Sequence, residues 1–378
     1  MMRAFKLLCA TSAALLLTAC PQQGGPKQSA AVQKLIAPDA VFAKMIQQGR
    51  RVDEPQGWVN DILATLDELK LQRTNANVCS VMAVIEQESG FKEDPPVAGL
   101  NQLLTKKIAK MEENLLMLAA LEVRLSQTMS NGLTFRQAIK NIKTERDLVR
   151  WYEAFTEAQF TGLILDRLGK GVDDLVSTVG SMQVSIDYSR RLAQTLGKPT
   201  ANMRDTLYTR VGGVFYGTAH LLYYPARYDN VLYRFADFNA GQYASRNAGF
   251  QVMLSQLTGQ KIVPDGDLLS HASGTDRSKN SQTQAALIQL FSKSAKNIQA
   301  QTIADDLARE KSIEFENTTT YATVIQLMQA KGLKPVPAAL PKIFLKSEKI
   351  TRSLTTEWYA NSVNARYQRC MGVAEKNL

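Results

Sequence analysis

Apolar residues recur at the spacing of an amphipathic helix along most of the chain. Within residues 57–72 the apolar positions are Val59, Ile62, Leu63, Leu66 and Leu69. Positions three and four apart share one face of a helix, so this segment predicts a helix with one buried side. Comparable patterns occupy residues 106–125, 209–225, 318–332 and 355–371. Alternation typical of strands is rare and clearest near 342–352, so we predict a mainly α fold with a minor β element.

The segment VCSVMAVIEQES, residues 78–89, places two glutamates at the end of a predicted helix. Its apolar stripe consists of Val78, Val81, Met82 and Ile85. Glu88 is the next member of that stripe, whereas Glu86 lies about 160° away around the helix axis. The periodicity therefore predicts that Glu88 ends a buried face and that Glu86 points toward water. Asn75 or Asn77 is the expected N-cap of this helix.

Burial would give the Glu88 carboxyl unusual chemistry. A carboxyl at the edge of an apolar wall has its charged form disfavoured, which raises its pKa. A raised pKa is what a general acid needs near neutral pH. From spacing alone, the plainer interpretation is a helix-terminal glutamate paired with a neighbouring Arg or Lys.

The first residues of the chain predict an export signal. Arg3 and Lys6 precede the apolar run LLCATSAALLLTA, which is too short to remain as a membrane-spanning helix. The run ends in LTAC, residues 17–20, which resembles the lipobox of bacterial lipoproteins. We therefore expect residues 1–19 to be a lipoprotein signal peptide.

The lipobox resemblance implies that Cys20 carries the lipid that anchors the protein to a membrane. Residues 20–40 are rich in Pro, Gly, Gln and Ala and are expected to form a flexible tether. Pro21 stands where an Asp would retain a lipoprotein in the inner membrane. The expected location is therefore the outer membrane, on either of its faces.

The charge balance is basic, with 45 Lys and Arg against 35 Asp and Glu. Removal of the signal takes away two of the basic residues and leaves the excess in place. Export argues against nucleic acid as a partner. Anionic envelope polymers and lipid surfaces fit the charge, which by itself names no ligand.

The cysteines suggest one disulfide. Cys9 lies in the signal and Cys20 is assigned to the lipid, which leaves Cys79 and Cys370. An oxidising periplasm favours pairing them, and two buried free thiols are the alternative. A bond between them would tie the C-terminal helix to the segment that carries Glu88.

Further stretches change the interpretation of Glu88. They are QESGF at 87–91, GSMQVS at 180–185 and FNAGQY at 238–243. In this order they resemble the lysozyme-like lytic transglycosylases of bacterial envelopes. That family cuts the β-1,4 bond between N-acetylmuramic acid and N-acetylglucosamine with one glutamate as acid and base, and needs no cofactor. The resemblance implies peptidoglycan glycan strands as the substrate.

The resemblance also implies residue roles. Glu88 would be the acid and base, and Ser89 would hydrogen-bond near it or the sugar. Gly180 would let the backbone approach the glycan, while Met182 and Gln183 would line the subsite. The opposite wall would comprise Asn239 and Gly241.

This chain departs from the family pattern at two places. Phe238 stands where the family has a tyrosine whose hydroxyl reaches the catalytic glutamate, and Tyr243, Tyr233 or Asp237 are candidates to compensate. The second departure is the long gap between Glu88 and Gly180.

The resemblance gives an expected domain organisation. Residues 41–378 would form one lysozyme-like α+β domain. Its parts would be a core at 57–100 and 175–255, a helical insertion at 101–170 and a C-terminal helical extension at 256–378. The insertion would serve as a lid, as a glycan clamp or as a block of the cleft.

A second resemblance covers the whole chain. The stretches NVCSVMAVIEQES, YRFADFNAGQYASRNA and KITRSLTT are similar to the YaiW-like outer-membrane lipoproteins, a family of largely unassigned function. The two resemblances together leave two hypotheses for the function. One is that the protein is a lytic transglycosylase. The other is a non-catalytic envelope lipoprotein that binds glycan or a partner protein and serves envelope integrity or uptake.

Other polar residues carry weaker hypotheses. His220 and His271 lack the spacing of a zinc site, so no metal is expected, and His220 is predicted to pack in the core. Arg227, Arg234 and Arg246 lie near an aromatic-rich stretch and are candidates to receive a carboxylate of peptidoglycan. Ordinary ion pairs are an equal alternative for these arginines.

Overall fold

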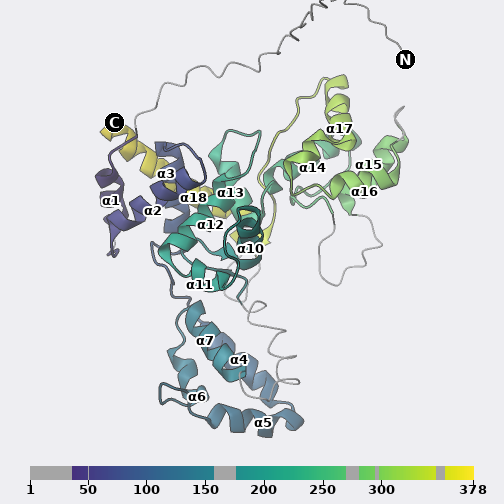
Figure 1. The fold of residues 1–378 in the computed structure, drawn as a ribbon. Coiled ribbons are helices and arrows are strands. Elements are labelled where there is room, and N and C mark those ends of the chain that lie inside the picture. The colour runs from purple at the N-terminus through teal and green to yellow at the C-terminus, as the bar shows by residue number, and fades with distance from the viewer. Residues whose placement is uncertain (1–35, 50, 157–175, 270–280, 294–297, 346–353) are drawn as a thin grey trace, which may run out of the picture. The chain divides into compact units, whose positions relative to one another are not determined.

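The computed structural model describes residues 36–49, 51–156, 176–269, 281–293, 298–345 and 354–378 (Figure 1). The signal peptide, Cys20 and nearly all of the tether predicted for 20–40 lie outside these residues. Part of the insertion predicted for 101–170 does so too. Residues 36–378 form one compact unit.

The described chain is mostly helical, which confirms the mainly α prediction. The α-helices are α1 Asp39–Gln47, α2 Pro55–Glu68, α3 Asn75–Glu88, α4 Leu100–Glu112, α5 Leu115–Ser126, α6 Phe135–Ala138, α7 Glu145–Thr156, α10 Ile186–Thr195, α11 Met203–Leu207, α12 Arg210–Leu222, α13 Val231–Ala240, α14 Ala244–Thr258, α15 Gln282–Ser292, α16 Ala300–Leu307, α17 Thr319–Ala330 and α18 Thr356–Ala374. Short 3-10 helices are η1 Ile139–Asn141, η2 Ile313–Asn317 and η3 Glu375–Asn377.

The β structure consists of short antiparallel pairs. β1 (Thr178–Val179) pairs with β2 (Val184–Ser185), and β3 (Phe344–Leu345) pairs with β4 (Leu354–Thr355). The second pair lies where the sequence predicts a hairpin, although residues 346–353 are not described. The first pair was not predicted, because two residues are too few to display alternation.

Helix α3 is buried on nearly every side. Thr74 caps its N-terminus, since the Thr74 hydroxyl accepts a hydrogen bond from the Asn77 backbone amide at 3.1 Å. The expected cap at Asn75 or Asn77 is therefore wrong by one to three residues. Beyond the predicted stripe, Cys79, Ala83 and Val84 are buried as well. A helix enclosed in this way is fixed on several sides by its neighbours.

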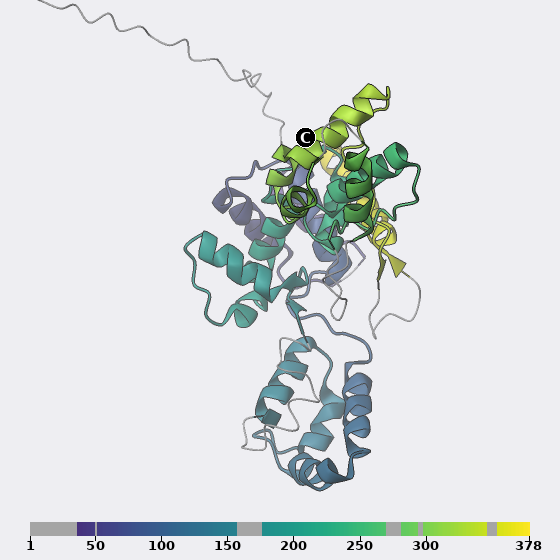
Figure 2. The ribbon, with the colours of Figure 1, turned by 90° about the vertical axis from the view of Figure 1, so that its right-hand side faces the viewer.

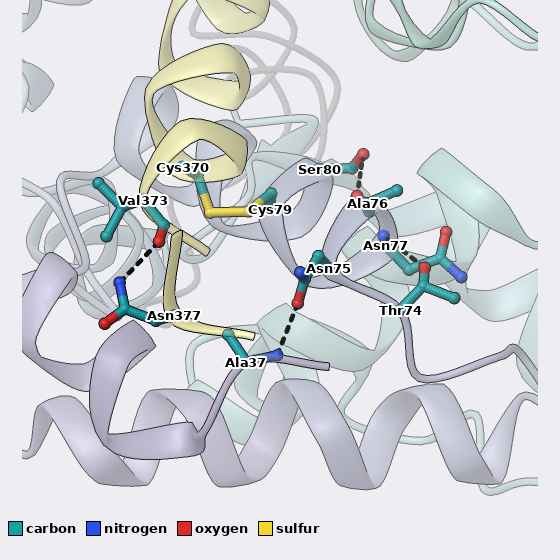
Figure 3. Close-up of a disulfide and its surroundings, with 10 residues drawn as sticks. All are labelled: Ala37, Thr74, Asn75, Ala76, Asn77, Cys79, Ser80, Cys370, Val373 and Asn377. Atoms are coloured by element: carbon teal, nitrogen blue, oxygen red, sulfur yellow. Dashed lines mark hydrogen bonds between the residues drawn. A yellow bond between two sulfur atoms is a disulfide. The ribbon is translucent and has the colours of Figure 1, made fainter. Parts of the chain in front are cut away.

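Helix α18 packs against α3 and α13, although it lies near the end of the chain. A disulfide between Cys79 and Cys370 joins α3 to α18, with the two Cα atoms 5.5 Å apart (Figure 3). On the chain-entropy view, a bond that closes so long a loop stabilises the fold by roughly 5 kcal/mol before native strain. Near the other end of the described chain, the backbone amide of Ala37 donates to Oδ1 of Asn75 in α3 at 2.9 Å (Figure 3), so both ends contribute to the surroundings of α3.

Buried apolar residues form two clusters. One contains α1 to α13 residues together with α18, and the other contains residues of α14 to α17. Helices α4 to α7 lie side by side in both views (Figures 1 and 2). A bridge between Pro96 and Thr144 joins the segments that precede α4 and α7. Contacts of this group with the rest of the unit include an ion pair of 3.2 Å between Arg204 and Glu153 and a hydrogen bond of 3.3 Å between Gln183 and Glu145.

Candidate functional site

Glu88, at the C-terminal end of α3, lines a cavity of about 980 Å³. The lining residues are Glu88, Thr178, Gln183, Ser185, Tyr188, Arg191, Leu192, Thr195, His220, Tyr223, Phe238, Asn239, Ala240, Gly241, Gln242 and Lys311. Segments far apart in the sequence therefore meet here. Each of the stretches that carry the transglycosylase resemblance supplies at least one residue of this wall.

Burial changes the acidity of Glu88. Desolvation raises the pKa of its carboxyl to about 7, the Tyr359 hydrogen bond opposes that rise, and the nearby charge of Glu145 adds to it. A carboxyl with such a pKa is protonated in an appreciable fraction of molecules at neutral pH. It can therefore both give and take a proton under the same conditions.

The tyrosine beside Glu88 comes from α18. The hydroxyl of Tyr359 donates a short hydrogen bond to Oε1 of Glu88, across 271 residues of sequence. Burial and the adjacent carboxylate raise the pKa of Tyr359 well above its ordinary value, so the phenol stays protonated. Tyr359 thus supplies the hydroxyl that contacts Glu88, and neither Phe238 nor the residues proposed to compensate for it does so.

One sequence signal could have located Tyr359. Glu88 follows Cys79 by nine residues and Tyr359 precedes Cys370 by eleven. If the disulfide joins two antiparallel helices, these residues lie roughly 14 and 16 Å from it along their axes. The two side chains are then expected at the same level, and the structure brings them into contact.

Gln183 lines the cavity from the turn between β1 and β2. Its side-chain amide donates to Oε2 of Glu145 and to the backbone oxygen of Gly180, both at 3.3 Å. Glu145 is buried and begins α7, inside the predicted insertion. Glu145 therefore links the insertion to the candidate site, and no motif in the sequence pointed to it.

The opposite wall comes from α13 and the residue that ends it. Oδ1 of Asn239 accepts a hydrogen bond of 3.0 Å from the hydroxyl of Thr356 in α18. The backbone oxygen of Phe238 accepts one of 3.3 Å from Nε2 of His220. Gly241 adopts φ +106°, which favours glycine. Helix α18 consequently positions Glu88 and Asn239 at once.

His220 is neutral in this wall. Its ring packs between those of Tyr188 and Phe238, with centroids 4.6 and 5.0 Å away. Burial lowers its pKa to about 4. His220 therefore packs among aromatic rings, but it is partly buried in the cavity wall and not in the core where the sequence predicted it.

Ser89 and Met182 do not line the cavity. The hydroxyl of Ser89 donates to the backbone oxygen of Ile85 at 3.1 Å and accepts from the amide of Lys92 at 3.3 Å, so it closes the end of α3. Met182 is fully buried against Gly217 of α12. The prediction that Ser89 and Met182 contact the substrate is therefore wrong for this cavity.

Gly180 and Tyr243 also have different roles from those expected. Gly180 adopts φ +82°, and a Cβ added there would lie 2.1 Å from the backbone oxygen of Leu207. The glycine is therefore required by packing against the chain, not by the approach of a glycan. Tyr243 is buried, and the guanidinium of Arg246 lies 4.5 Å from its ring centroid.

The arginines proposed to receive a carboxylate are engaged elsewhere. Arg227 pairs with Glu316 at 2.9 Å. Arg246 is buried and donates to the backbone oxygen of Ser312 at 2.6 Å. Arg234 donates to backbone oxygens of the chain near α12. The cations that do line the cavity are Arg191 and Lys311.

Glu86 does not simply face water. Its side chain is 21% exposed, and Oε1 lies 2.9 Å from Nη2 of Arg369 and 3.7 Å from Nε of Arg366. Helical phase placed it on a different side of α3 from Glu88, as predicted, but α18 covers that side too.

Sequence comparison identifies the family. A model of the family described as "Protein of unknown function (DUF1615)" matches residues 51–373. The chain belongs to the DUF1615 family. It is 35% identical over 364 residues to the "Uncharacterized protein YaiW" of Escherichia coli (strain K12), and the alignment covers 95% of this chain and 96% of the relative. No solved structure matches the chain.

The match to YaiW confirms the predicted whole-chain resemblance. Neither comparison bears on lipidation or on a reaction, so these stay predictions. Within the described ranges of this DUF1615 chain, no helix combines the length and apolar character needed to cross a membrane.

Proposed function

We propose that this protein acts on peptidoglycan as a lytic transglycosylase, with Glu88 as its acid and base. One observation carries the proposal: the Glu88 carboxyl, with a pKa raised to about 7, shares a cavity of about 980 Å³ with Gln183 and Asn239. A cavity of this size accommodates several sugar rings.

The proposed reaction needs one carboxyl. Protonated Glu88 gives its proton to the oxygen that links the muramic acid C1 to the next sugar, and the C1–O bond breaks. The C6 hydroxyl of the muramic acid then attacks C1, and its proton passes to the Glu88 carboxylate. The products are a 1,6-anhydro sugar and a free hydroxyl, and the carboxyl regains its starting form.

The residues around Glu88 suit these roles. Tyr359 orients the carboxyl by its hydrogen bond and stabilises the ionised form, while the charge of Glu145 favours the protonated form. Burial is the main cause that raises the pKa of Glu88 to about 7, and these two neighbours adjust it in opposite directions. Gln183 and Asn239 are held by Glu145 and Thr356 and offer amide groups to sugar hydroxyls and acetamides.

A second candidate function is glycan binding without cleavage. The observation that favours it is that Phe238 stands where the lytic transglycosylases have a tyrosine, while Oε1 of Glu88 is already engaged by the hydroxyl of Tyr359. In that case the cavity would hold a strand, or an envelope protein, for envelope integrity or uptake.

The proposed setting is the bacterial envelope. The signal-like residues 1–19 and Cys20 support export and a lipid anchor in the outer membrane, where a tether would carry the domain toward the peptidoglycan layer. No cofactor enters the proposed reaction.

Purified full-length protein in mild detergent, incubated with peptidoglycan sacculi, tests the proposal. Mass spectrometry should find anhydro-muropeptides, and Glu88→Gln should lower their yield by a factor of about 10²–10⁴, the usual range for general acid–base catalysis. Glu86→Gln, the same chemical change two residues away, should keep the yield. Absence of anhydro products, or equal yields from both variants, would refute catalysis. Sedimentation with sacculi then tests binding alone.

A further inference from the structure

The candidate cavity contains two cationic side chains that the proposed bond cleavage does not use. Arg191 lies in α10 and Lys311 precedes η2, and both are exposed. Neither side chain has an ion-pair or hydrogen-bond partner among the residues that the structure describes. By contrast, the side chain of Arg190, the residue before Arg191, pairs with Asp187 at 3.3 Å.

The rest of the described cavity wall offers these cations little negative charge. Glu88 is the one acid among its described lining residues, and His220 is neutral because burial lowers its pKa. With Glu88 protonated, the wall therefore carries two positive charges. The charge of Arg191 also acts on the phenol of Tyr188, which places the guanidinium beside another wall residue.

We propose that Arg191 and Lys311 form a carboxylate-binding subsite, so that the cavity selects acidic glycan strands over neutral ones. A guanidinium and an ammonium group in the wall of one cavity match carboxylates in charge and hydrogen-bonding capacity. The inference rests on glycan as the ligand of the proposed function. It does not rest on cleavage.

The carboxylate can come from two sources on the same strand. One is the lactyl group on the muramic acid ring, which becomes a free carboxylate when the peptide stem is removed. The other is the peptide stem itself. Strands with and without stems distinguish the two, and chitohexaose supplies a neutral β-1,4 strand of similar length.

Binding is measured with full-length protein carrying Glu88→Gln, so that no strand is consumed. Adding Arg191→Gln with Lys311→Gln should weaken binding of acidic strands about tenfold and leave chitohexaose binding unchanged. Raising the salt concentration should shrink that difference. Arg190→Gln with Arg309→Gln removes the same charge outside the cavity and should have no effect.

The outcomes separate the proposals. Loss only on stem-free strands assigns the lactyl carboxylate, and loss only on stem-bearing strands assigns the stem. Loss on both means that the subsite accepts either carboxylate. Equal loss on chitohexaose, or no loss on either acidic strand, overturns the subsite. Failure of the Glu88→Gln parent to bind any strand overturns the glycan-binding premise as well. Binding without anhydro products overturns only the transglycosylase activity. Circular dichroism of each variant checks that it is folded.

Discussion

Glu86 and Glu88 leave the same helix, and α18 meets both, yet their environments differ. Glu88 lines the larger cavity and accepts a hydrogen bond from the phenol of Tyr359. Glu86 lines a cavity of about 490 Å³ and lies in ion-pair range of Arg366 and Arg369. The residues of α18 therefore give Glu86 positively charged neighbours and give Glu88 a neutral hydrogen-bond donor.

The difference explains why only one of the two carboxyls is suited to proton transfer. A phenol orients a carboxylate without supplying a countercharge, so desolvation dominates and the pKa of Glu88 rises. Guanidinium groups bring the countercharge with them, and Glu86 serves as a link between helices. Two glutamates one residue apart thus perform separate tasks.

The largest expected effect concerns the bond that holds α3 to α18. Replacing Cys79 and Cys370 by Ser should lower the free energy of unfolding by about 3–5 kcal/mol, because the unfolded chain regains a loop of nearly its full length. Urea unfolding followed by circular dichroism measures it. Wild-type protein under reducing conditions should match the double variant. A change below about 1 kcal/mol would mean that the other α3–α18 contacts suffice.

The pH dependence of stability separates the two glutamates without any substrate. Because the folded-state pKa of Glu88 lies near 7, above its value of 4.5 in an unfolded chain, the folded protein binds the extra proton between these values. The contribution of this proton to the free energy of unfolding is fully present below pH 4.5. It is lost as pH rises toward 7, by about 3 kcal/mol in total.

Unfolding curves at several pH values test this contribution. In Glu88→Gln the free energy of unfolding should decline less between pH 4.5 and 7 than in the wild type. In Glu86→Gln the full decline should remain. An unchanged slope in Glu88→Gln would show that the carboxyl titrates at an ordinary pKa, and the chemical role proposed for it would then lose its basis.

Two neighbours should shift the pKa of Glu88 in opposite directions. Tyr359→Phe removes a donor that stabilises the carboxylate, so the pKa should rise above about 7, and Glu145→Gln removes a nearby negative charge, so it should fall. A shift of roughly one unit in each direction is expected. Carbon-13 NMR of labelled glutamate measures both. Shifts of the same sign would show that the changes act through the fold.

Apolar periodicity and short motifs predicted which segments form this site better than they predicted which side chains touch there. The apolar period placed Glu88 at the end of a buried helix, and the short motifs brought Gln183, Asn239 and Gly241 into the hypothesis. Met182 and Tyr243 failed because a motif gives the order of residues and not the side of the backbone on which each lies. Met182 packs against Gly217 of α12, and Tyr243 packs against Arg246 of α14, the helix that it directly precedes.

The missed residues share one physical cause. Tyr359 and Glu145 reach the site through tertiary packing, one from the C-terminal helix and one from the predicted insertion. No periodicity within either segment encodes its neighbour. The hydroxyl bonded to Glu88 comes from Tyr359 and not from the FNAG stretch, so the phenylalanine at position 238 does not leave this carboxyl without a donor.

The smallest effect belongs to the ion pair on the other side of α3. Arg369 is 61% exposed, and its pair with Glu86 is open to water and salt. Arg369→Ala should therefore change the free energy of unfolding by no more than about 0.5 kcal/mol. It should also leave the pKa of Glu88 in place, because Arg369 is not among the groups that shift it. Urea unfolding and the same NMR titration measure both quantities. A loss above 2 kcal/mol would mean that the ion pair, rather than the disulfide and the Tyr359 contact, sets the position of α18.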